Sequence, residues 1–210
     1  MTKILIADDH PIVREGLKRI LLETSDMVAV DEAGTSQEVL ERVRQNDYDL
    51  VLLDISLPDR SGLDVLKELK RTKPDLQILV ISIHPEELYA VRAMRAGAAG
   101  YLTKESAPDE LMAAVQKVLL GRKYINASLA EKLAFALEVD VEKPPHEILS
   151  DREYQVMSMI ASGKTVKQIA EELMLSAKTI NTYRSRVLRK MRVNSSVELI
   201  HYAIENRLVD

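Results

Sequence analysis

The chain has 210 residues, of which 46% are apolar, and it contains no cysteine. This length suits one large domain or two small ones, and the lack of cysteine excludes disulfides, thiolate metal sites and cysteine nucleophiles. Met1-Thr2-Lys3 leads straight into an apolar segment, so we expect no secretory leader. No apolar run approaches the roughly 18 residues that cross a bilayer. We therefore expect a protein without a membrane span in a reducing compartment, by default the cytoplasm.

The net charge of −4 is unevenly distributed along the chain. Residues 148–210 carry 10 Lys and Arg against 7 Asp and Glu, whereas the residues before them carry 19 against 26. The C-terminal region is therefore basic, and the rest of the chain is acidic. This small asymmetry favours contact with nucleic acid through the C-terminal region only.

Short apolar runs alternate with segments of helical spacing from the N-terminus to residue 121. Such runs are typical of strands buried on both faces of a parallel sheet, so the repeat predicts an α/β fold of the flavodoxin-like (βα)5 type, with strand order 2-1-3-4-5. The second strand then lies at the edge, and Asp31 and Glu32, which follow it, are expected to be peripheral. The predicted strands cover residues 4–7, 27–30, 50–53, 78–81 and 99–102, and the predicted helices cover 10–23, 36–46, 62–72, 85–96 and 108–121.

Polar side chains follow the other four predicted strands and define a candidate site. In this strand order, ligands bind outside the carboxyl ends of the strands, where strands 1 and 3 lie side by side. Asp8-Asp9 follow strand 1 and Asp54 follows strand 3, so three carboxylates should meet there. Ser82 and Lys104 follow strands 4 and 5, and they add a hydroxyl and an ammonium group at the same edge.

The chemistry of this residue set points to phosphoryl transfer. Neighbouring carboxylates repel one another unless a cation lies among them, and Mg²⁺ prefers hard oxygen ligands of this kind. A carboxylate nucleophile, a metal ion, a lysine and a hydroxyl supply the positioning and charge stabilisation that phosphoryl transfer needs. Asp54 is the expected nucleophile because it alone is a single carboxylate ending its strand. Taken singly, each residue has an ordinary explanation as a turn, a cap or a solvated surface group, and only their joint placement predicts the site.

The alternation of strands and helices ends after Gly121. An amphipathic stretch at 128–137 predicts a connecting helix, and the charged segment 138–146 with Pro144-Pro145 predicts a linker. From Ser150 onward the spacing is helical, beginning with a capping box over Ser150-Asp151-Arg152-Glu153. We expect an N-terminal domain over 1–122, a connecting helix and linker over 123–147, and an all-α domain of four helices over 148–210.

Two short helices joined by a turn near residues 174–176 predict a helix-turn-helix. On the second of them, 177–191, one face carries Ile180, Tyr183, Val187 and Met191, which are expected to pack inward. Arg184 lies nearer this side and should contact backbone phosphate or a neighbouring helix. The opposite face is polar and basic, which suits DNA phosphates and base edges, although solvated helix faces are often of this composition. The residues predicted to contact DNA are Lys178, Asn181, Thr182, Ser185, Arg186 and Arg189.

The N-terminal region resembles the receiver domain of response regulators. The segments that carry this resemblance are Ile6-Ala7-Asp8-Asp9-His10-Pro11, Asp54-Ile55-Ser56-Leu57-Pro58 with Gly62, and Gly100-Tyr101-Leu102-Thr103-Lys104. The resemblance implies that Asp54 accepts the phosphoryl group and that Lys104 pairs with the phosphoryl oxygens. It also implies that Asp9, Asp54 and the carbonyl of Ser56 bind Mg²⁺, with Asp8 in support.

The same resemblance implies how such a site would signal. A sensor histidine kinase would donate the phosphoryl group, and Ser82 would move to bond it while Tyr101 swings inward. A phosphoryl group adds charge and acceptor oxygens that can order nearby loops. The phosphorylated receiver would then dimerise, so the partners implied are a kinase and a second copy of the chain.

The C-terminal region resembles the DNA-binding domain of LuxR/NarL-type regulators. In that family the bases are contacted mainly from positions that here hold Asn181, Thr182 and Ser185, so the implied partner is double-stranded DNA. The family often has Lys, His and Asn where this chain has Asn181, Tyr183 and Arg186, so a relative's target sequence does not transfer. The matching segments are Leu149-Ser150-Asp151-Arg152-Glu153, Ile160-Ala161-Ser162-Gly163, Gln168-Ile169-Ala170, Ser176-Ala177-Lys178-Thr179-Ile180 and Lys190-Met191.

These features lead to the hypothesis of a two-component response regulator that controls transcription and is not a turnover enzyme. One alternative is a metal-dependent phosphatase that uses an aspartyl phosphate. Such enzymes usually need an aspartate two residues after the nucleophile as acid and base, and here that position is Ser56. A second alternative is a DNA-binding protein whose N-terminal domain only dimerises, and the complete acidic set argues against it.

Overall fold

The computed structural model describes residues 1–24, 28–83, 86–127, 129–131, 144–206 and 208–209. The chain forms two compact units, Met1–Ala134 and Phe135–Asp210. Most of the predicted connecting helix at 128–137 and most of the predicted linker lie outside the described residues; the described residues 129–131 are helical. The domain limits at 122 and 147 therefore stay predictions.

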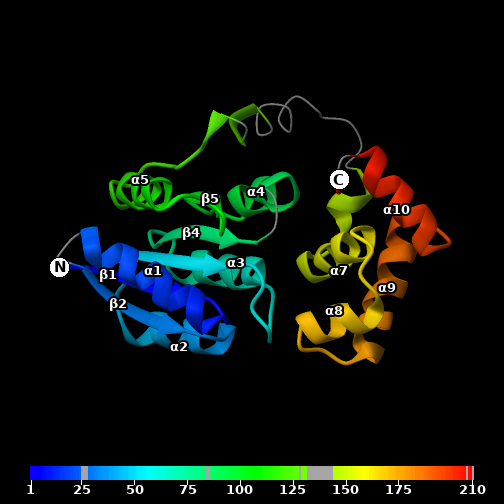
Figure 1. Cartoon of the computed structure of the whole chain (residues 1–210), viewed down its shortest axis with the longest axis horizontal. Helices are drawn as coiled ribbons and strands as arrows, with labels where there is room; N and C mark the ends of the chain where they lie inside the picture. Colours follow the sequence, from blue (N-terminus) through cyan, green and yellow to red (C-terminus); the bar gives the residue numbers. More distant parts are fainter. Residues whose placement is uncertain (25–27, 84–85, 128, 132–143, 207, 210) are drawn as a thin grey trace. The chain divides into compact units, whose positions relative to one another are not determined.

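The first unit is built on a five-stranded parallel sheet, drawn as arrows in Figure 1. Its strand order is β2-β1-β3-β4-β5, which confirms the predicted flavodoxin-like fold. The strands are β1 (Thr2–Ala7), β2 (Val28–Ala33), β3 (Leu50–Asp54), β4 (Gln77–Ser82) and β5 (Gly100–Thr103). The helices between and after them are α1 (Pro11–Thr24), α2 (Ser36–Gln45), α3 (Gly62–Thr72), α4 (Glu86–Arg95) and α5 (Pro108–Leu119).

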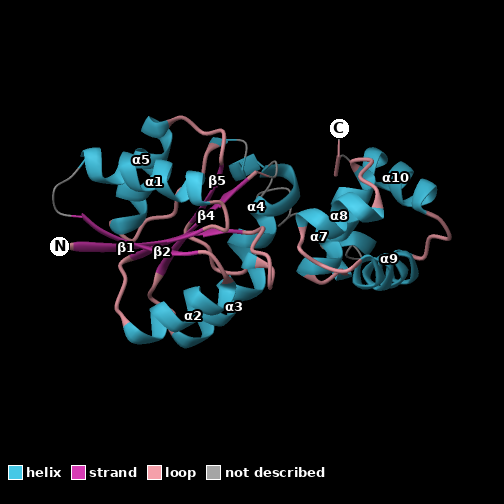
Figure 2. Cartoon of the chain, turned by 60° about the horizontal axis from the view of Figure 1, so that its bottom comes forward, coloured by secondary structure: helices cyan, strands magenta, loops and turns pink. Residues whose placement is uncertain are grey.

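Helices cover both faces of this sheet, which explains why its central strands are apolar without alternation. In Figure 2, α1 and α5 lie on one side of the sheet, and α2 and α3 lie on the other. Ile4 and Ile6 of β1 face the core beneath α1 and α5, whereas Leu5 between them is fully buried toward the opposite layer. Successive side chains of a strand point to opposite faces, so both must be apolar here.

The strand β2 is longer than predicted. It continues to Ala33, so Asp31 and Glu32 lie within the strand and not after it.

Gly62 allows α3 to begin close to the end of β3. The backbone N–H of Gly62 donates to the carbonyl of Ile55 at 2.9 Å. A Cβ atom on Gly62 would lie 2.0 Å from the backbone oxygen of Asp54, so only glycine permits α3 to begin this close to the sheet.

The second unit is helical and contains the predicted helix-turn-helix. Ser150 and Glu153 form the predicted capping box of the first α-helix, α7. Met174 in the turn of this helix-turn-helix adopts a left-handed conformation with φ of 50°. The elements are η1 (Pro145–Ile148), α7 (Asp151–Ala161), α8 (Val166–Glu172), α9 (Ala177–Met191) and α10 (Ser196–Glu205). Within the described parts of both units, no helix combines the length and the apolar character needed to cross a membrane.

Candidate functional site

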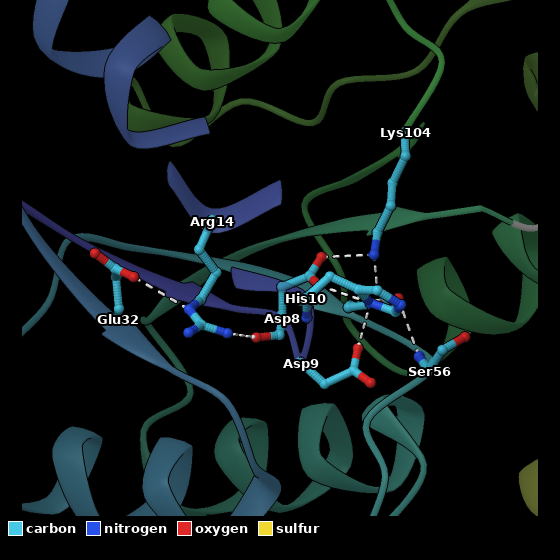
Figure 3. Close-up of polar contacts among 8 residues, drawn as sticks. Asp8, Asp9, His10, Arg14, Glu32, Ser56 and Lys104 are labelled. Atoms are coloured by element: carbon cyan, nitrogen blue, oxygen red, sulfur yellow. Dashed lines mark hydrogen bonds and ion pairs between the residues drawn. The ribbon is translucent and has the colours of Figure 1, made fainter. Parts of the chain in front are cut away.

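Two aspartates from neighbouring strands form the centre of the site. Ala7 of β1 pairs with Leu53 of β3, so Asp8 and Asp54, the next residue in each strand direction, come side by side at the carboxyl edge. Both are buried, with 2% and 1% of their surface exposed. The Lys104 ammonium, just beyond β5, lies 2.6 Å from Asp8 Oδ2 (Figure 3) and 2.8 Å from Asp54 Oδ2. One lysine therefore bridges two buried carboxylates and offsets only part of their charge.

The loop after β1 adds further polar groups to this centre. The backbone N–H of His10 donates to Asp8 Oδ1 at 2.8 Å, which closes a tight turn over Asp9. The imidazole Nδ1 of His10 lies 2.7 Å from Asp9 Oδ1, while most of the histidine ring is exposed. Candidate ligand atoms of Asp8, Asp9, His10 and Asp54 all lie within 4.8 Å of one another. The turn thus places the Asp9 carboxylate close to the carboxylates of Asp8 and Asp54.

The electrostatics of Asp54 reflect its position beneath the surface. Burial raises the pKa of its carboxyl, and the Asp8 carboxylate raises it further, against the lowering effects of Lys104 and the Ser56 backbone N–H. That N–H donates to Asp54 Oδ1 at 3.0 Å. Burial also disfavours the charged form of Lys104, but the carboxylates of Asp54 and Asp8 outweigh it and raise the pKa of Lys104. Asp54 thus carries unfavourable negative charge that one ammonium does not fully offset.

The residues of the site fit a divalent cation. Three carboxylates face one another against one buried ammonium, so the cluster has more negative than positive charge. Hard cations take oxygen ligands, and these carboxylates provide them. The acidic group Asp8, Asp9 and Asp54 therefore has the donor set and the charge surplus of a cation pocket.

The two remaining residues predicted for this site are both buried. Ser82 ends β4 with no exposed surface, and its backbone oxygen accepts a hydrogen bond from the N–H of Lys104 at 2.7 Å. Ser82 pairs in register with Thr103, the last residue of β5, so it lies at the same sheet edge as Asp54. Tyr101 is 1% exposed and already lies inside the domain. The resemblance implies that this tyrosine swings inward on phosphorylation, and in this structure its side chain is buried.

Two charged residues beside the site were not identified from the sequence. Arg14 of α1 donates from Nη1 to the backbone oxygen of Asp8 at 2.6 Å and from Nε to Glu32 Oε2 at 3.1 Å. Figure 3 shows this chain of contacts from Glu32 through Arg14 to Asp8. The sequence predicted Glu32 to be peripheral, and its strand is indeed at the edge, yet it reaches the site through Arg14. No motif or spacing in the sequence pairs these two residues.

The polar face predicted on α9 is exposed in the second unit. Ile180, Val187 and Met191 are buried as predicted, whereas Tyr183 is only partly buried, with the Arg186 guanidinium 6.0 Å from its ring centre. Arg184 donates to the Ser196 hydroxyl at 2.9 Å, so of the two expected contacts it makes the one to a neighbouring helix. The exposed residues are Lys178, Asn181, Thr182, Ser185, Arg186 and Arg189.

The hydroxyls on this face are held by the helix itself. Thr182 Oγ1 donates to the carbonyl of Lys178 at 3.0 Å, and Ser185 Oγ donates to that of Asn181 at 2.9 Å. Such bonds one turn back occupy the proton and leave the oxygen lone pairs directed outward. The face therefore presents acceptors, an amide and three cationic side chains in a fixed pattern.

Comparisons with known proteins match both units. Residues 4–116 match the family described as response regulator receiver domain, and residues 147–203 match bacterial regulatory proteins of the luxR family. The chain is 38% identical to the response regulator UvrY of Escherichia coli strain K12 over 209 residues, which cover 99% of this chain and 96% of that protein. It is 36% identical to the response regulator GacA of Pseudomonas aeruginosa over 211 residues, covering 100% and 99%.

Solved structures agree with these matches. The RcsB protein of Salmonella enterica serovar Typhimurium, bound to the promoter rprA in the presence of the phosphomimetic BeF3⁻, is similar with a TM-score of 0.63 and 27% identity, covering 96% of this chain and 98% of that one. An RcsB–DNA complex gives a TM-score of 0.59 at 27% identity, with 96% of each chain covered. The chain therefore belongs to the two-component response regulators of the NarL/FixJ family, with a phospho-accepting receiver domain and a DNA-binding LuxR-type helix-turn-helix domain.

Proposed function

We propose that Asp54 accepts the phosphoryl group and that Asp8, Asp9, Asp54 and the backbone carbonyl of Ser56 hold Mg²⁺. The observation that carries this proposal is the buried Asp54 carboxylate, 2.8 Å from Lys104 and grouped with two further carboxylates. The raised pKa of Asp54 supports it as well, because a desolvated carboxylate is a stronger nucleophile than a solvated one.

The residues would share the work of transfer as follows. A carboxylate oxygen of Asp54 forms a bond to phosphorus while the bond from phosphorus to the donor's leaving group breaks. Bound Mg²⁺ supplies positive charge that offsets the phosphoryl oxygens and the three carboxylates. Lys104 shifts its ammonium from the carboxylates toward the new phosphoryl oxygens. Ser82 donates a hydrogen bond from its hydroxyl to one of these oxygens. Tyr101, which is buried in this structure, would occupy the interior in the phosphorylated state.

A sensor histidine kinase is the proposed donor, and a phosphorylated homodimer on double-stranded DNA is the proposed active form. The family supports the kinase, since receivers of this kind serve two-component systems. The RcsB neighbours, which include two dimers bound to two parallel DNAs, support the dimer and the DNA. Members of the family are generally not enzymes beyond their own phosphorylation chemistry. Ser56, in the position where a phosphatase would carry its acid, agrees with this.

The proposal is tested by comparing wild type with Asp54→Asn, each with Mg²⁺ and with or without a small acyl phosphate. Oligomeric state is measured by light scattering, and DNA binding by fluorescence anisotropy on a duplex selected from a random pool with the phosphorylated wild type. We expect the donor to produce a dimer and tighter binding only in wild type. Equal behaviour of the two proteins would overturn the role of Asp54 and favour a constitutive DNA-binding protein.

Base reading by α9 gives a second expected result. Replacing Asn181 or Ser185 with alanine should weaken binding to the selected duplex by about 1–3 kcal/mol, while binding to a scrambled duplex changes little. Replacing Arg189 with alanine should weaken binding to both duplexes, because a phosphate contact carries no sequence information. It should also reduce the slope of the logarithm of the binding constant against the logarithm of the salt concentration by about one in magnitude.

The two classes of α9 variant are separated by titrating each protein on both duplexes at several salt concentrations. Thermal melting by circular dichroism checks that every variant is folded, and these exposed positions are expected to leave the melting temperature nearly unchanged. If the Asn181 and Ser185 variants lost affinity equally for both duplexes, this face would not read bases.

A further inference from the structure

The edge strand β2 is connected to the acidic site by a chain of charged side chains. Glu32 of β2 accepts from Arg14 Nε at 3.1 Å and from Lys18 Nζ at 3.0 Å. Arg14 then uses its other arm, Nη1, to donate to the backbone oxygen of Asp8 at 2.6 Å. Figure 3 shows the guanidinium lying between Glu32 and the Asp8 carbonyl. Lys18 thus shares Glu32 with Arg14.

Burial and charge indicate that this connection is firmly held. The Arg14 and Glu32 side chains are only 17% and 29% exposed, whereas Arg19 and Glu23, an ion pair on the same helix, are 79% and 62% exposed. The hydrogen bond from Lys18 lowers the pKa of Glu32, and Arg14 adds to this against the effect of burial. Glu32 is therefore ionised at neutral pH. A partly buried guanidinium that bonds two partners is held more rigidly than an exposed ion pair.

The Asp8 carbonyl belongs to the peptide group that joins Asp8 to Asp9. That group is planar, so fixing its oxygen also fixes the direction in which the backbone of Asp9 leaves it. The N–H of Asp8 is held on its other side by the carbonyl of Ala33 at 3.0 Å. With both its N–H and its carbonyl bonded, Asp8 has little freedom to turn. The orientation of the Asp9 carboxylate then depends on Arg14.

Charge balance gives a second reason for the pairing with Glu32. A guanidinium at the Asp8 carbonyl with no counter-charge would repel a divalent cation entering the site. The Glu32 carboxylate neutralises Arg14 on the side away from the cluster, so the carbonyl is held without adding net positive charge there. An amide at position 32 would lose this compensation as well as the hydrogen bond that orients the guanidinium.

We propose that Arg14 is a positioning residue for the cation site: through the Asp8 carbonyl it sets the Asp9 carboxylate for Mg²⁺, and Glu32 holds Arg14 in place and balances its charge. This proposal rests on the proposed function, in which Asp8 and Asp9 hold the metal. It predicts that Arg14 affects how tightly Mg²⁺ binds, while the rate of phosphoryl transfer at saturating Mg²⁺ is set by Asp54 and Lys104.

The experiment titrates Mg²⁺ into the full chain by calorimetry for wild type, Arg14→Gln, Glu32→Gln, the double variant and Lys18→Met. Arg14→Gln should weaken Mg²⁺ by about 10-fold or more, the range that loss of an outer contact to a metal ligand produces. Glu32→Gln should weaken it by less. The double variant should be no worse than Arg14→Gln, because both changes act through one contact. Lys18→Met, which keeps the Arg14 contacts, should stay within about twofold of wild type.

A kinetic measurement separates positioning from a merely structural role. With a small acyl phosphate as donor, Arg14→Gln should need about 10-fold more Mg²⁺ for half-maximal phosphorylation, while its rate at saturating Mg²⁺ stays within about threefold of wild type. Arg14→Lys, which can reach one of the two partners but cannot bridge them, should have an intermediate requirement. Thermal melting in EDTA reports folding, and Glu32→Gln and Arg14→Lys carry the test if Arg14→Gln does not fold.

The outcomes are distinguishable. If Arg14→Gln or Arg14→Lys changes Mg²⁺ affinity no more than Lys18→Met does, the positioning role is overturned. The same holds if Arg14→Gln lowers the saturated rate with no change in Mg²⁺ requirement. If wild type itself shows no Mg²⁺ binding that Asp9→Asn removes, the proposed metal site fails, and the positioning role falls with it.

Discussion

Asp54→Asn is expected to abolish phosphorylation and, in metal-free buffer at neutral pH, to raise the free energy of unfolding. The asparagine amide matches the carboxylate in shape but is not a nucleophile, so the rate should fall by more than about 10³-fold. The gain in stability follows from burial, which raises the pKa of Asp54 despite its contact with Lys104. An ionised Asp54 is therefore a net cost to the fold that the neutral amide removes, while Lys104 keeps its 2.6 Å contact with Asp8.

The sign of the pH dependence makes this prediction specific. Because the folded pKa of Asp54 lies above its ordinary value of 3.8, the folded state holds this proton more tightly than the unfolded state does. Wild type then loses stability as pH rises from the unfolded pKa through the folded one, relative to a variant that cannot ionise. The stability difference between Asp54→Asn and wild type should be small in acid and grow to a plateau.

Urea denaturation in EDTA across the pH range checks this prediction. Asp59→Asn is the matched control, because Asp59 follows in the same loop but bonds to Ser36 and Gln37 at the start of α2. The pKa of Asp59 is lowered by the Ser36 hydrogen bonds, which outweigh burial, so its ionised form stabilises the fold. The control should lose stability at neutral pH. An Asp54→Asn protein less stable than wild type at pH 7 would contradict the prediction.

Lys104→Met is expected to lower the free energy of unfolding by about 3 kcal/mol in metal-free buffer, as breaking a buried ion pair typically does. Methionine retains much of the side-chain volume but removes the ammonium that lies within 3 Å of Asp8 and Asp54. Those two buried carboxylates then face each other without a counter-charge. Millimolar Mg²⁺ should restore part of the loss, since a cation that binds only the folded state stabilises it.

The pH profile again follows from the shifts. The folded pKa of Lys104 is raised, so its stabilising contribution is complete below 10.5 and is lost only as pH rises through the folded value. In acid, protonation of Asp54 does the neutralising instead, because the pKa of that carboxyl is raised. The gap between Lys104→Met and wild type should therefore be widest near neutral and mildly alkaline pH and narrow toward acid.

Lys70→Met provides the control for the effect of Mg²⁺. Lys70 is also partly buried, but its ammonium donates to the carbonyls of Pro74 and Leu76, in the loop before β4 and away from the carboxyl ends of the strands. Its loss should destabilise the domain to an extent that Mg²⁺ does not restore. Chemical denaturation of the three proteins with EDTA and with Mg²⁺ makes the comparison. Equal responses to Mg²⁺ in the two variants would show that Lys104 is not exchanging charge with a metal site.

The sequence by itself determined the sheet, the main polar residues of the site and the exposed face of α9. Solid apolar runs such as Leu50-Val51-Leu52-Leu53 are typical of strands buried on both faces, and parallel strands bring their carboxyl ends to one edge. The positions of Asp8, Asp54 and Ser82 at that edge follow from this rule. Helical periodicity placed Ile180 and Val187 inside and Ser185 outside for the same kind of local reason.

Only the tertiary structure decided which side chains meet. Arg14 and Glu32 are 18 residues apart on different elements, and the register of β2 against β1 together with the docking of α1 brings them together at the Asp8 carbonyl. The sharing of Lys104 between two aspartates and the burial of Tyr101 depend in the same way on packing. Periodicity states which face a residue occupies, but contacts between distant segments depend on register and docking, which local pattern does not encode.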